Sequence, residues 1–197
     1  MITEIESPPK TKARQGHVPG ERDLWLFLFC DMLMFGVFFS MIAALRAQHT
    51  EMFVAAQETL HPRWGVVNTS VLLTSSLFVV IGMRLARARH RRAPLFFLAA
   101  VACGLMFAGV KAIEYTSLIQ DGHTASANDF YMYYFMFTGI HLGHVVIGMG
   151  ALIVASRMSR PTTTATHRMA VLEGIASFWH LVDMLWIMLF ATLYLMR

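Results

Sequence analysis

The chain has 197 residues, of which 56% are hydrophobic and only 14% are charged, and its formal net charge is +4. A soluble domain of this size needs far more charge to cover its surface, so this composition excludes an ordinary soluble enzyme. About 20 apolar residues suffice to cross a hydrocarbon core about 30 Å thick. Five stretches of at least that length occupy most of the chain, and they leave no room for a separate catalytic domain.

The predicted elements, in chain order, are the membrane-spanning helices Leu24–Arg46, Trp64–Ala86, Pro94–Leu118, Phe130–Ser156 and Val171–Met196. Backbone polar groups in lipid must be satisfied internally, and uninterrupted apolar runs of this length exclude barrel strands. The sequence therefore predicts an all-α integral membrane bundle of five transmembrane helices over 24–197, preceded by a hydrophilic segment over 1–23. Three pairs of small residues have helix-packing spacing and favour close helix contacts: Gly36 and Ser40, Gly104 and Ala108, and Gly139 and Gly143.

The basic residues are distributed unevenly between the two sides of the predicted bundle. Twelve of the 16 Lys and Arg lie on the side of the N-terminus, three lie on the other side, and Lys111 falls within a span. The densest group joins the second and third spans: Arg84, Arg87, Arg89, Arg91 and Arg92. Positive charge favours the cytoplasmic side, so we expect the N-terminal segment inside and the C-terminus outside. The place of this basic loop between two spans favours topology over nucleic-acid binding as its explanation.

Several ionisable residues lie inside the predicted spans, where each costs about 2.5–3.5 kcal/mol on insertion scales unless it is paired or faces a cavity. Asp31 lies early in the first span among Phe and Met residues. Two interpretations remain open for it. The carboxyl is either proton-accessible or an anchor to a partner helix, or it is neutral and hydrogen-bonded to a backbone carbonyl.

In the third span, Lys111 and Glu114 are three residues apart, so they share a helix face and can form an internal pair, with Tyr115 next to them. Snorkelling of the lysine toward the outer surface is the alternative. An ion pair that locks the bundle or holds a lipid headgroup is favoured over proton transfer.

Histidines mark the last two spans. His141 and His144 share a face of the fourth span, and His180 and Asp183 share a face of the fifth. Three histidines and an aspartate near mid-membrane could ligate a metal. A polar network that aligns the two helices is the favoured interpretation.

Motifs in all five spans, in order, resemble subunit III of the haem-copper oxidases. Trp25–Phe39 resembles the family's helix with a membrane carboxylate ahead of a Phe-rich stretch, and Asn68–Ser76 resembles the next helix. Gly104–Tyr115 is similar to its Glu-Tyr helix and Thr138–Val145 to its two-histidine helix. Phe178–Trp186 is similar to the Trp-His-x-Val-Asp-x-x-Trp signature near the family's C-terminus.

This resemblance implies an accessory, non-catalytic subunit of a respiratory terminal oxidase that reduces dioxygen and pumps protons, in a bacterial plasma membrane. It implies no catalytic or metal-ligating residue and no cofactor in this chain. Haem and copper are expected in the partner catalytic subunit I, and the other partners are further oxidase subunits and phospholipid held between helix groups. Asp31 and Glu114 would be the buried carboxylates related to proton uptake. The remaining polar positions would form a network or line the lipid cleft: Lys111, Tyr115, His141, His144, His180 and Asp183.

Two departures from the family pattern bear on the partner complex. The long family form has seven helices, whereas five are typical of shorter bacterial members. Position 111 is usually Gln, and Lys111 resembles instead the subunit-III-like accessory protein of nitric oxide reductase. An alternative of another class is an independent membrane metalloprotein using the histidines, or a proton carrier built around Asp31 and the Lys111–Glu114 pair.

Overall fold

The structure, a computed structural model, describes residues 22–60, 62–160 and 166–195. It contains α1 (Arg22–Gln48), α2 (Thr50–Thr59), α3 (Pro62–Arg87), α4 (Ala93–Gln120), α5 (Asp129–Met158), α6 (Thr166–Phe190) and the π-helical turn η1 (Ala191–Leu195). Five of these helices are long and apolar enough to cross a membrane, which confirms the all-α class and the five predicted spans. The described residues contain no strand. Most of the predicted N-terminal segment, residues 1–21, lies outside the described residues, as does Met196.

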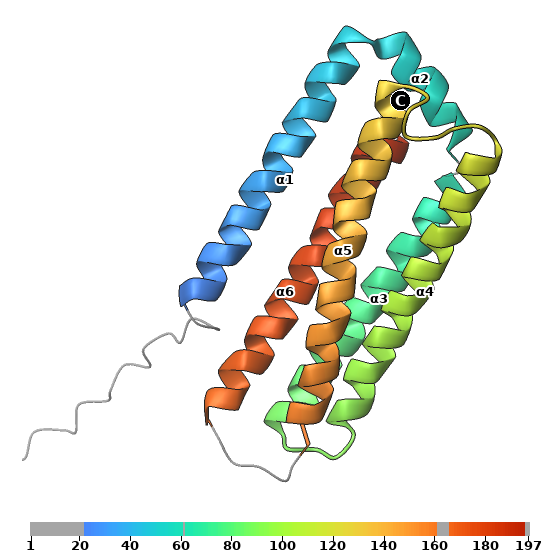
Figure 1. Ribbon diagram of the computed structural model, residues 1–197. Helices are drawn as coiled ribbons and strands as arrows, with labels where there is room; N and C mark the ends of the chain where they lie inside the picture. The colour runs from blue at the N-terminus through green and yellow to red at the C-terminus, as the bar shows by residue number, and fades with distance from the viewer. Residues whose placement is uncertain (1–21, 61, 161–165, 196–197) are drawn as a thin grey trace, which may run out of the picture.

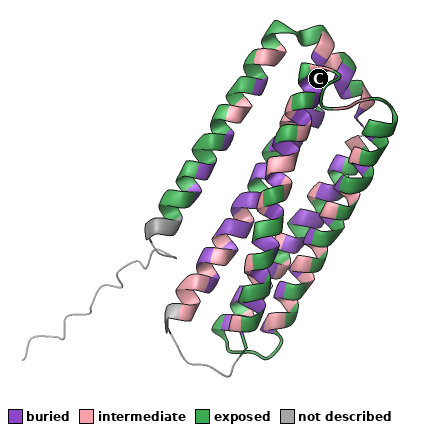
Figure 2. Cartoon of the chain, in the orientation of Figure 1, coloured by how far each residue is buried: buried purple, intermediate pink, exposed green. Residues whose placement is uncertain are grey.

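The helices α3, α4, α5 and α6 form an antiparallel four-helix body, shown in Figure 1. Its centre is aromatic, and the side chains of Phe97, Phe107, Trp179 and Trp186 are fully buried. Figure 2 shows that α6 carries the most continuous buried surface, whereas the outward faces of the other long helices are exposed. Since those exposed faces consist largely of Leu, Ile, Val and Met, the body presents an apolar exterior that suits a lipid environment.

Local signals set the helix boundaries. Pro94 lies in the first turn of α4, where a missing backbone N–H does no harm. Gly122 follows the end of α4 with a φ of +83°, a left-handed conformation that glycine adopts without strain. Asn128 precedes α5, and its side-chain oxygen accepts a hydrogen bond from the Tyr131 backbone N–H at 3.0 Å. These features make the turn between α4 and α5 a defined connection.

Helix α1 lies along one side of the body, and α2 crosses the end of the body where η1 and the start of α5 lie (Figure 1). Helix α2 was not predicted, because its ten residues of mixed polarity are too short for a membrane span. Phe53 of α2 packs edge-on against Phe130, and the Gln57 side-chain amide donates to the Thr192 and Leu193 carbonyls of η1 at 3.4 and 3.2 Å. Helix α2 therefore fastens the C-terminal turn to the body.

The structure keeps the two charged ends of the bundle apart. The arginines from Arg84 to Arg92 lie where α3 ends and α4 begins, at the same end as the start of α1 (Figure 1). Arg46 lies in the last turn of α1, at the opposite end. The arginine-rich loop and Arg46 thus lie on opposite sides of the bundle, as the sequence predicted. The direction of the chain across the membrane stays a prediction from the positive-inside rule.

Candidate functional site

The pair predicted from the spacing of Lys111 and Glu114 is present and lies deep in the four-helix body. The Lys111 Nζ lies 2.9 Å from the Glu114 Oε2, and the lysine is only 1% exposed. The same ammonium donates to the Tyr134 hydroxyl at 2.9 Å and to the Tyr194 hydroxyl at 3.1 Å. All three donors of the ammonium group are thus used, and the lysine does not snorkel to the surface.

Aromatic rings complete the surroundings of this ammonium. Its nitrogen lies between 4.9 and 5.7 Å from the ring centroids of Tyr115, Tyr134, Trp186 and Tyr194. The Tyr194 hydroxyl also donates to the Glu114 Oε1 at 2.5 Å, so both carboxylate oxygens are bonded. Ring faces attract a desolvated cation, and together these contacts compensate for burial of the charge. We call this group of Lys111, Glu114, Tyr134 and Tyr194 the cage.

The buried Asp31 and the partly buried His144 form a second pair, which joins α1 to α5. The His144 Nε2 lies 3.0 Å from the Asp31 Oδ1. The other ring nitrogen, Nδ1, lies 2.9 Å from the Ile140 backbone carbonyl, which can only accept, so Nδ1 carries a hydrogen. A contact between Nε2 and a carboxyl oxygen then requires one more proton, on the imidazole or on the carboxyl. This pair is a one-proton site, and the second Asp31 oxygen has no hydrogen-bond partner within the described residues.

His141 shares α5 with His144 but meets different neighbours. It is fully buried, and its ring lies edge-on to Phe107 at 5.7 Å and tilted against Trp186 at 5.4 Å between centroids. Neither ring nitrogen has a hydrogen-bond partner among the residues that the structure places. Trp186 in turn donates from its indole N–H to the Thr69 hydroxyl at 3.1 Å. His141 therefore belongs to the aromatic layer beside the cage and does not bridge to Asp31.

The last two predicted positions, on α6, face α3. The His180 Nδ1 lies 2.5 Å from the Ser76 hydroxyl, a partner on α3. Asp183 is buried, and its carboxyl oxygens have no hydrogen-bond partner within the described part of the chain. His180 thus contacts α3, and no hydrogen bond joins the histidines of α5 and α6 within the described ranges. The His144 pair reaches α1 instead.

The arrangement also bears on a resident metal. No three His, Cys, Asp or Glu side chains gather as a metal-binding group within the described ranges. The three histidines of α5 and α6 each point to a different neighbour: Asp31, the Phe107 ring and Ser76. The cysteines, Cys30 and Cys103, are both free thiols.

Sequence reasoning missed the two tyrosines of the cage. Tyr134 and Tyr194 lie on α5 and η1, far in sequence from Lys111, and nothing in their local pattern distinguishes them from the other membrane tyrosines. The one available signal was the lysine itself, because a buried ammonium needs three acceptors and Glu114 alone supplies one or two.

The chain is similar to known proteins over nearly its whole length. The family model of cytochrome c oxidase subunit III matches residues 20–197, which is nearly the whole chain. The chain is 29% identical over 175 residues to cytochrome c oxidase subunit 3 of Thermostichus vulcanus, covering 88% of this chain and 85% of that protein. It is 27% identical over 174 residues to cytochrome bo(3) ubiquinol oxidase subunit 3 of Pseudomonas aeruginosa, covering 87% and 82%.

A third relative is the probable quinol oxidase subunit 3 of Staphylococcus haemolyticus, which is 23% identical over 172 residues, covering 87% of this chain and 86% of that protein. Each relative aligns over most of its own length, so the likeness concerns the whole bundle and not one motif. With five membrane spans in the structure, it identifies a multi-pass protein of the bacterial plasma membrane. The chain belongs to the cytochrome c oxidase subunit III family.

Proposed function

We propose that the chain is the accessory, non-catalytic subunit of a respiratory haem-copper terminal oxidase. The relatives named above are subunits 3 of cytochrome c and quinol oxidases, which supports an oxidase as the parent complex. In this proposal the catalytic subunit I carries the haem and copper, and this chain packs against it and stabilises it. Association with other oxidase subunits follows from the family itself.

The Asp31–His144 pair is the observation that carries a role in proton uptake. It holds one proton between Nε2 and Oδ1, at the joint between α1 and α5, within an apolar membrane environment. Phe35 lies against the His144 ring, with centroids 5.6 Å apart, and shields the pair on one side. A histidine–carboxyl pair that holds one proton inside the membrane suits a role in taking up and releasing protons near an entry point.

We also propose that a phospholipid binds in the opening between α1 and the four-helix body. The opening is lined by Phe35, Gly36 and Phe39 of α1 and by Leu181, Leu185 and two methionines of α6. These side chains are apolar and include Met residues that adapt to irregular shapes. We expect an acyl chain to fill this space and to hold α1 against the body.

Mild-detergent purification of the tagged full-length chain from its host tests the proposal. We expect a larger subunit with haem and copper to co-purify, visible in the absorption spectrum and by metal analysis, in a complex that retains phospholipid. A chain that purifies alone with its own chromophore, or with a stoichiometric transition metal, would support the independent metalloprotein and contradict the accessory role.

A second parent complex is favoured by one residue. Lys111, in place of the family's usual Gln, resembles the accessory protein of nitric oxide reductase, and here the lysine anchors the whole cage. If the co-purifying subunit carries haem and non-haem iron instead of haem and copper, the chain serves nitric oxide reduction. The same purification therefore separates the two complexes.

A further inference from the structure

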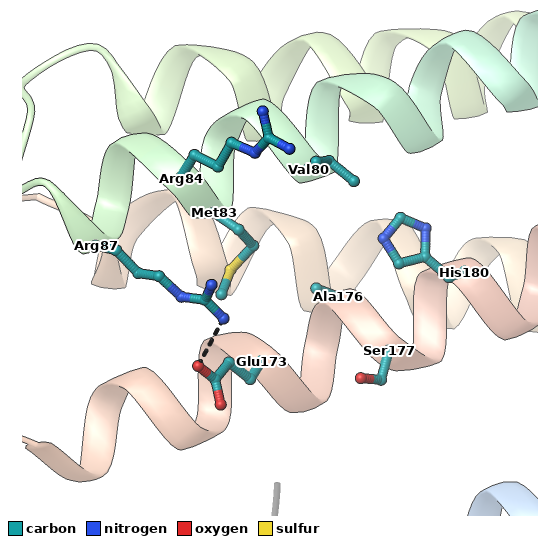
Figure 3. Close-up of a pocket in the computed structure, with 8 residues that line it drawn as sticks. All are labelled: Val80, Met83, Arg84, Arg87, Glu173, Ala176, Ser177 and His180. Atoms are coloured by element: carbon teal, nitrogen blue, oxygen red, sulfur yellow. Dashed lines mark hydrogen bonds and ion pairs between the residues drawn. The ribbon is translucent and has the colours of Figure 1, made fainter. Parts of the chain in front are cut away.

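A groove between α3 and α6 opens at the arginine-rich end of the bundle (Figure 3). Its volume is about 340 Å³, within the range of about 300–1,000 Å³ that is typical of small-molecule sites. The groove is lined by apolar residues, among them Val80 and Ala176, and by five charged or polar ones: Arg84, Arg87, Glu173, Ser177 and His180. From Glu173 to His180 the α6 wall runs for seven residues, which is about 10 Å of helix.

The two arginines of the groove are in different situations. Arg87 forms an ion pair with Glu173, with 2.9 Å between the Arg87 Nη2 and the Glu173 Oε1. Arg84 has no hydrogen bond or ion pair within the described ranges, although it lies in the last turn of α3 beside the same groove. Counting these three groups, the groove carries one net positive charge, and that charge resides on Arg84.

The direction of the Arg84 side chain matters for what can neutralise it. Figure 3 shows it running along α3 toward Val80, away from the end of the helix. Side chains on a helix tilt toward its N-terminus, and the N-terminus of α3 is at the far side of the membrane. Snorkelling toward water at the near end therefore opposes the natural direction of this side chain. The guanidinium therefore lies within the groove, and an anion that neutralises it must enter the groove from the near end.

We infer that this groove binds the headgroup of an anionic phospholipid, with the phosphodiester on the Arg84 guanidinium and the glycerol region along the Val80 and Ala176 wall. Basic pockets between membrane helices on the cytoplasmic side are sites of this kind, and guanidinium groups bind phosphate in a forked geometry. One net positive charge matches the single negative charge of a phosphatidylglycerol. The Glu173 carboxylate keeps Arg87 occupied and disfavours ligands with a second negative charge.

The inference extends the proposed lipid binding to a second, chemically different position, and it is tested separately from the parent complex. The full-length chain is stripped of lipid in detergent and titrated with phosphatidylglycerol, phosphatidylcholine or inorganic phosphate, and bound ligand is counted by native mass spectrometry. We expect one phosphatidylglycerol to bind at least about fivefold more tightly than phosphatidylcholine, as one arginine at a membrane surface provides. Inorganic phosphate should give no comparable binding.

Two variants and a control make the assignment specific. Arg84→Gln should abolish the preference for phosphatidylglycerol. Val80→Phe keeps every charge but fills the groove, and it should weaken the binding of phosphatidylglycerol by a similar factor. Arg157→Gln, an exposed arginine in the last turn of α5 at the same end of the bundle, should bind as the wild type does. An unchanged preference in Arg84→Gln, equal binding of both lipids to the wild type, or equal binding of inorganic phosphate would overturn the inference. The parent complex would still be identified by co-purification in each case.

Discussion

The four-helix body and the helix α1 bury charge in different ways. In the body, the Lys111 ammonium contacts three oxygen acceptors, and both Glu114 oxygens accept hydrogen bonds. On α1, Asp31 reaches the body through one contact to His144 and leaves its second oxygen without a partner among the described residues. Several hydrogen bonds hold the cage at once, whereas the α1 joint depends on one polar contact between Asp31 and His144. We therefore expect the cage to contribute most to stability, whereas the α1 joint is where the proposed function places proton exchange.

The strongest test of this difference removes one partner of the cage. Glu114→Gln leaves the Lys111 charge buried without its counter-ion, and breaking a buried pair in this way costs about 3–5 kcal/mol. We expect the free energy of unfolding in mixed micelles, titrated with a denaturing detergent, to fall by that amount. The double variant Lys111→Met with Glu114→Gln is the matched control, because it removes both charges and should recover most of the loss. An unchanged midpoint for the single variant would show that the cage is not a stabilising element.

A second variant tests how tightly the body itself is packed. A methyl group on Gly148 would lie 2.7 Å from the Trp179 Cε3, and that indole is fully buried and cannot move aside. We expect Gly148→Ala to lower the free energy of unfolding by about 1–3 kcal/mol, measured in the same titration. Gly150→Ala, on the same helix with no atom within 4 Å of the added methyl, is the control. Equal effects of the two substitutions would mean that α5 and α6 do not meet closely at Gly148.

At the α1 joint, stability and function should separate. Asp31→Ala leaves the His144 Nε2 without its partner, and we expect a loss of about 1–2 kcal/mol in the free energy of unfolding. Asp31→Asn offers an amide donor to the same nitrogen, so it should keep most of that stability while losing the exchangeable proton. In the intact oxidase, both variants should retain the haem content and lose activity faster during turnover. Loss of all haem in either variant would contradict the assigned role.

The smallest effect is expected at the surface pair of Arg87 and Glu173. The arginine side chain is 58% exposed, so water screens the interaction, and exposed pairs contribute about 0–1 kcal/mol. In lipid-free detergent, Arg87→Gln should change the free energy of unfolding by less than about 1 kcal/mol, as the same titration can measure. A loss as large as that of Glu114→Gln would place this groove among the structural elements of the body.

The five spans and the Lys111–Glu114 pair were predicted from the sequence, whereas the contacts between helices were not. Apolar length alone defines a membrane helix, so all five were found, and the three-residue spacing of Lys111 and Glu114 defines a helix face without any tertiary information. Contacts between helices depend on their rotation and depth, which local spacing does not specify. For that reason the link from Asp31 to His144 and the tyrosines of the cage were not predicted.

Small residues show the same limit. The spacing of Gly139 and Gly143 suggested a helix contact, yet a methyl group at either position would meet nothing within 4 Å. Among the predicted positions, Gly104 does make a close contact, with Met149 and Trp179. Other close contacts are at Gly65, which meets Phe190, and Gly148, which meets Trp179, and neither was predicted. A small residue permits close approach, but only the large residue opposite it decides where the approach occurs.

The π-helical turn at the end of α6 has a consequence for how the chain's length can vary. Each residue of an α-helix advances the rotation by about 100°, and a π turn inserts extra backbone into that progression. Here the turn sets the rotation about the helix axis that brings the Tyr194 hydroxyl to Glu114. Gln57 of α2 binds the carbonyls of the two residues that precede Tyr194 in the same turn. Deleting a single residue between Trp186 and Tyr194 would swing the hydroxyl to another side of the helix. The register of residues 191–195 is therefore constrained, because only changes that preserve this residue count keep the Tyr194 hydroxyl within hydrogen-bond distance of Lys111.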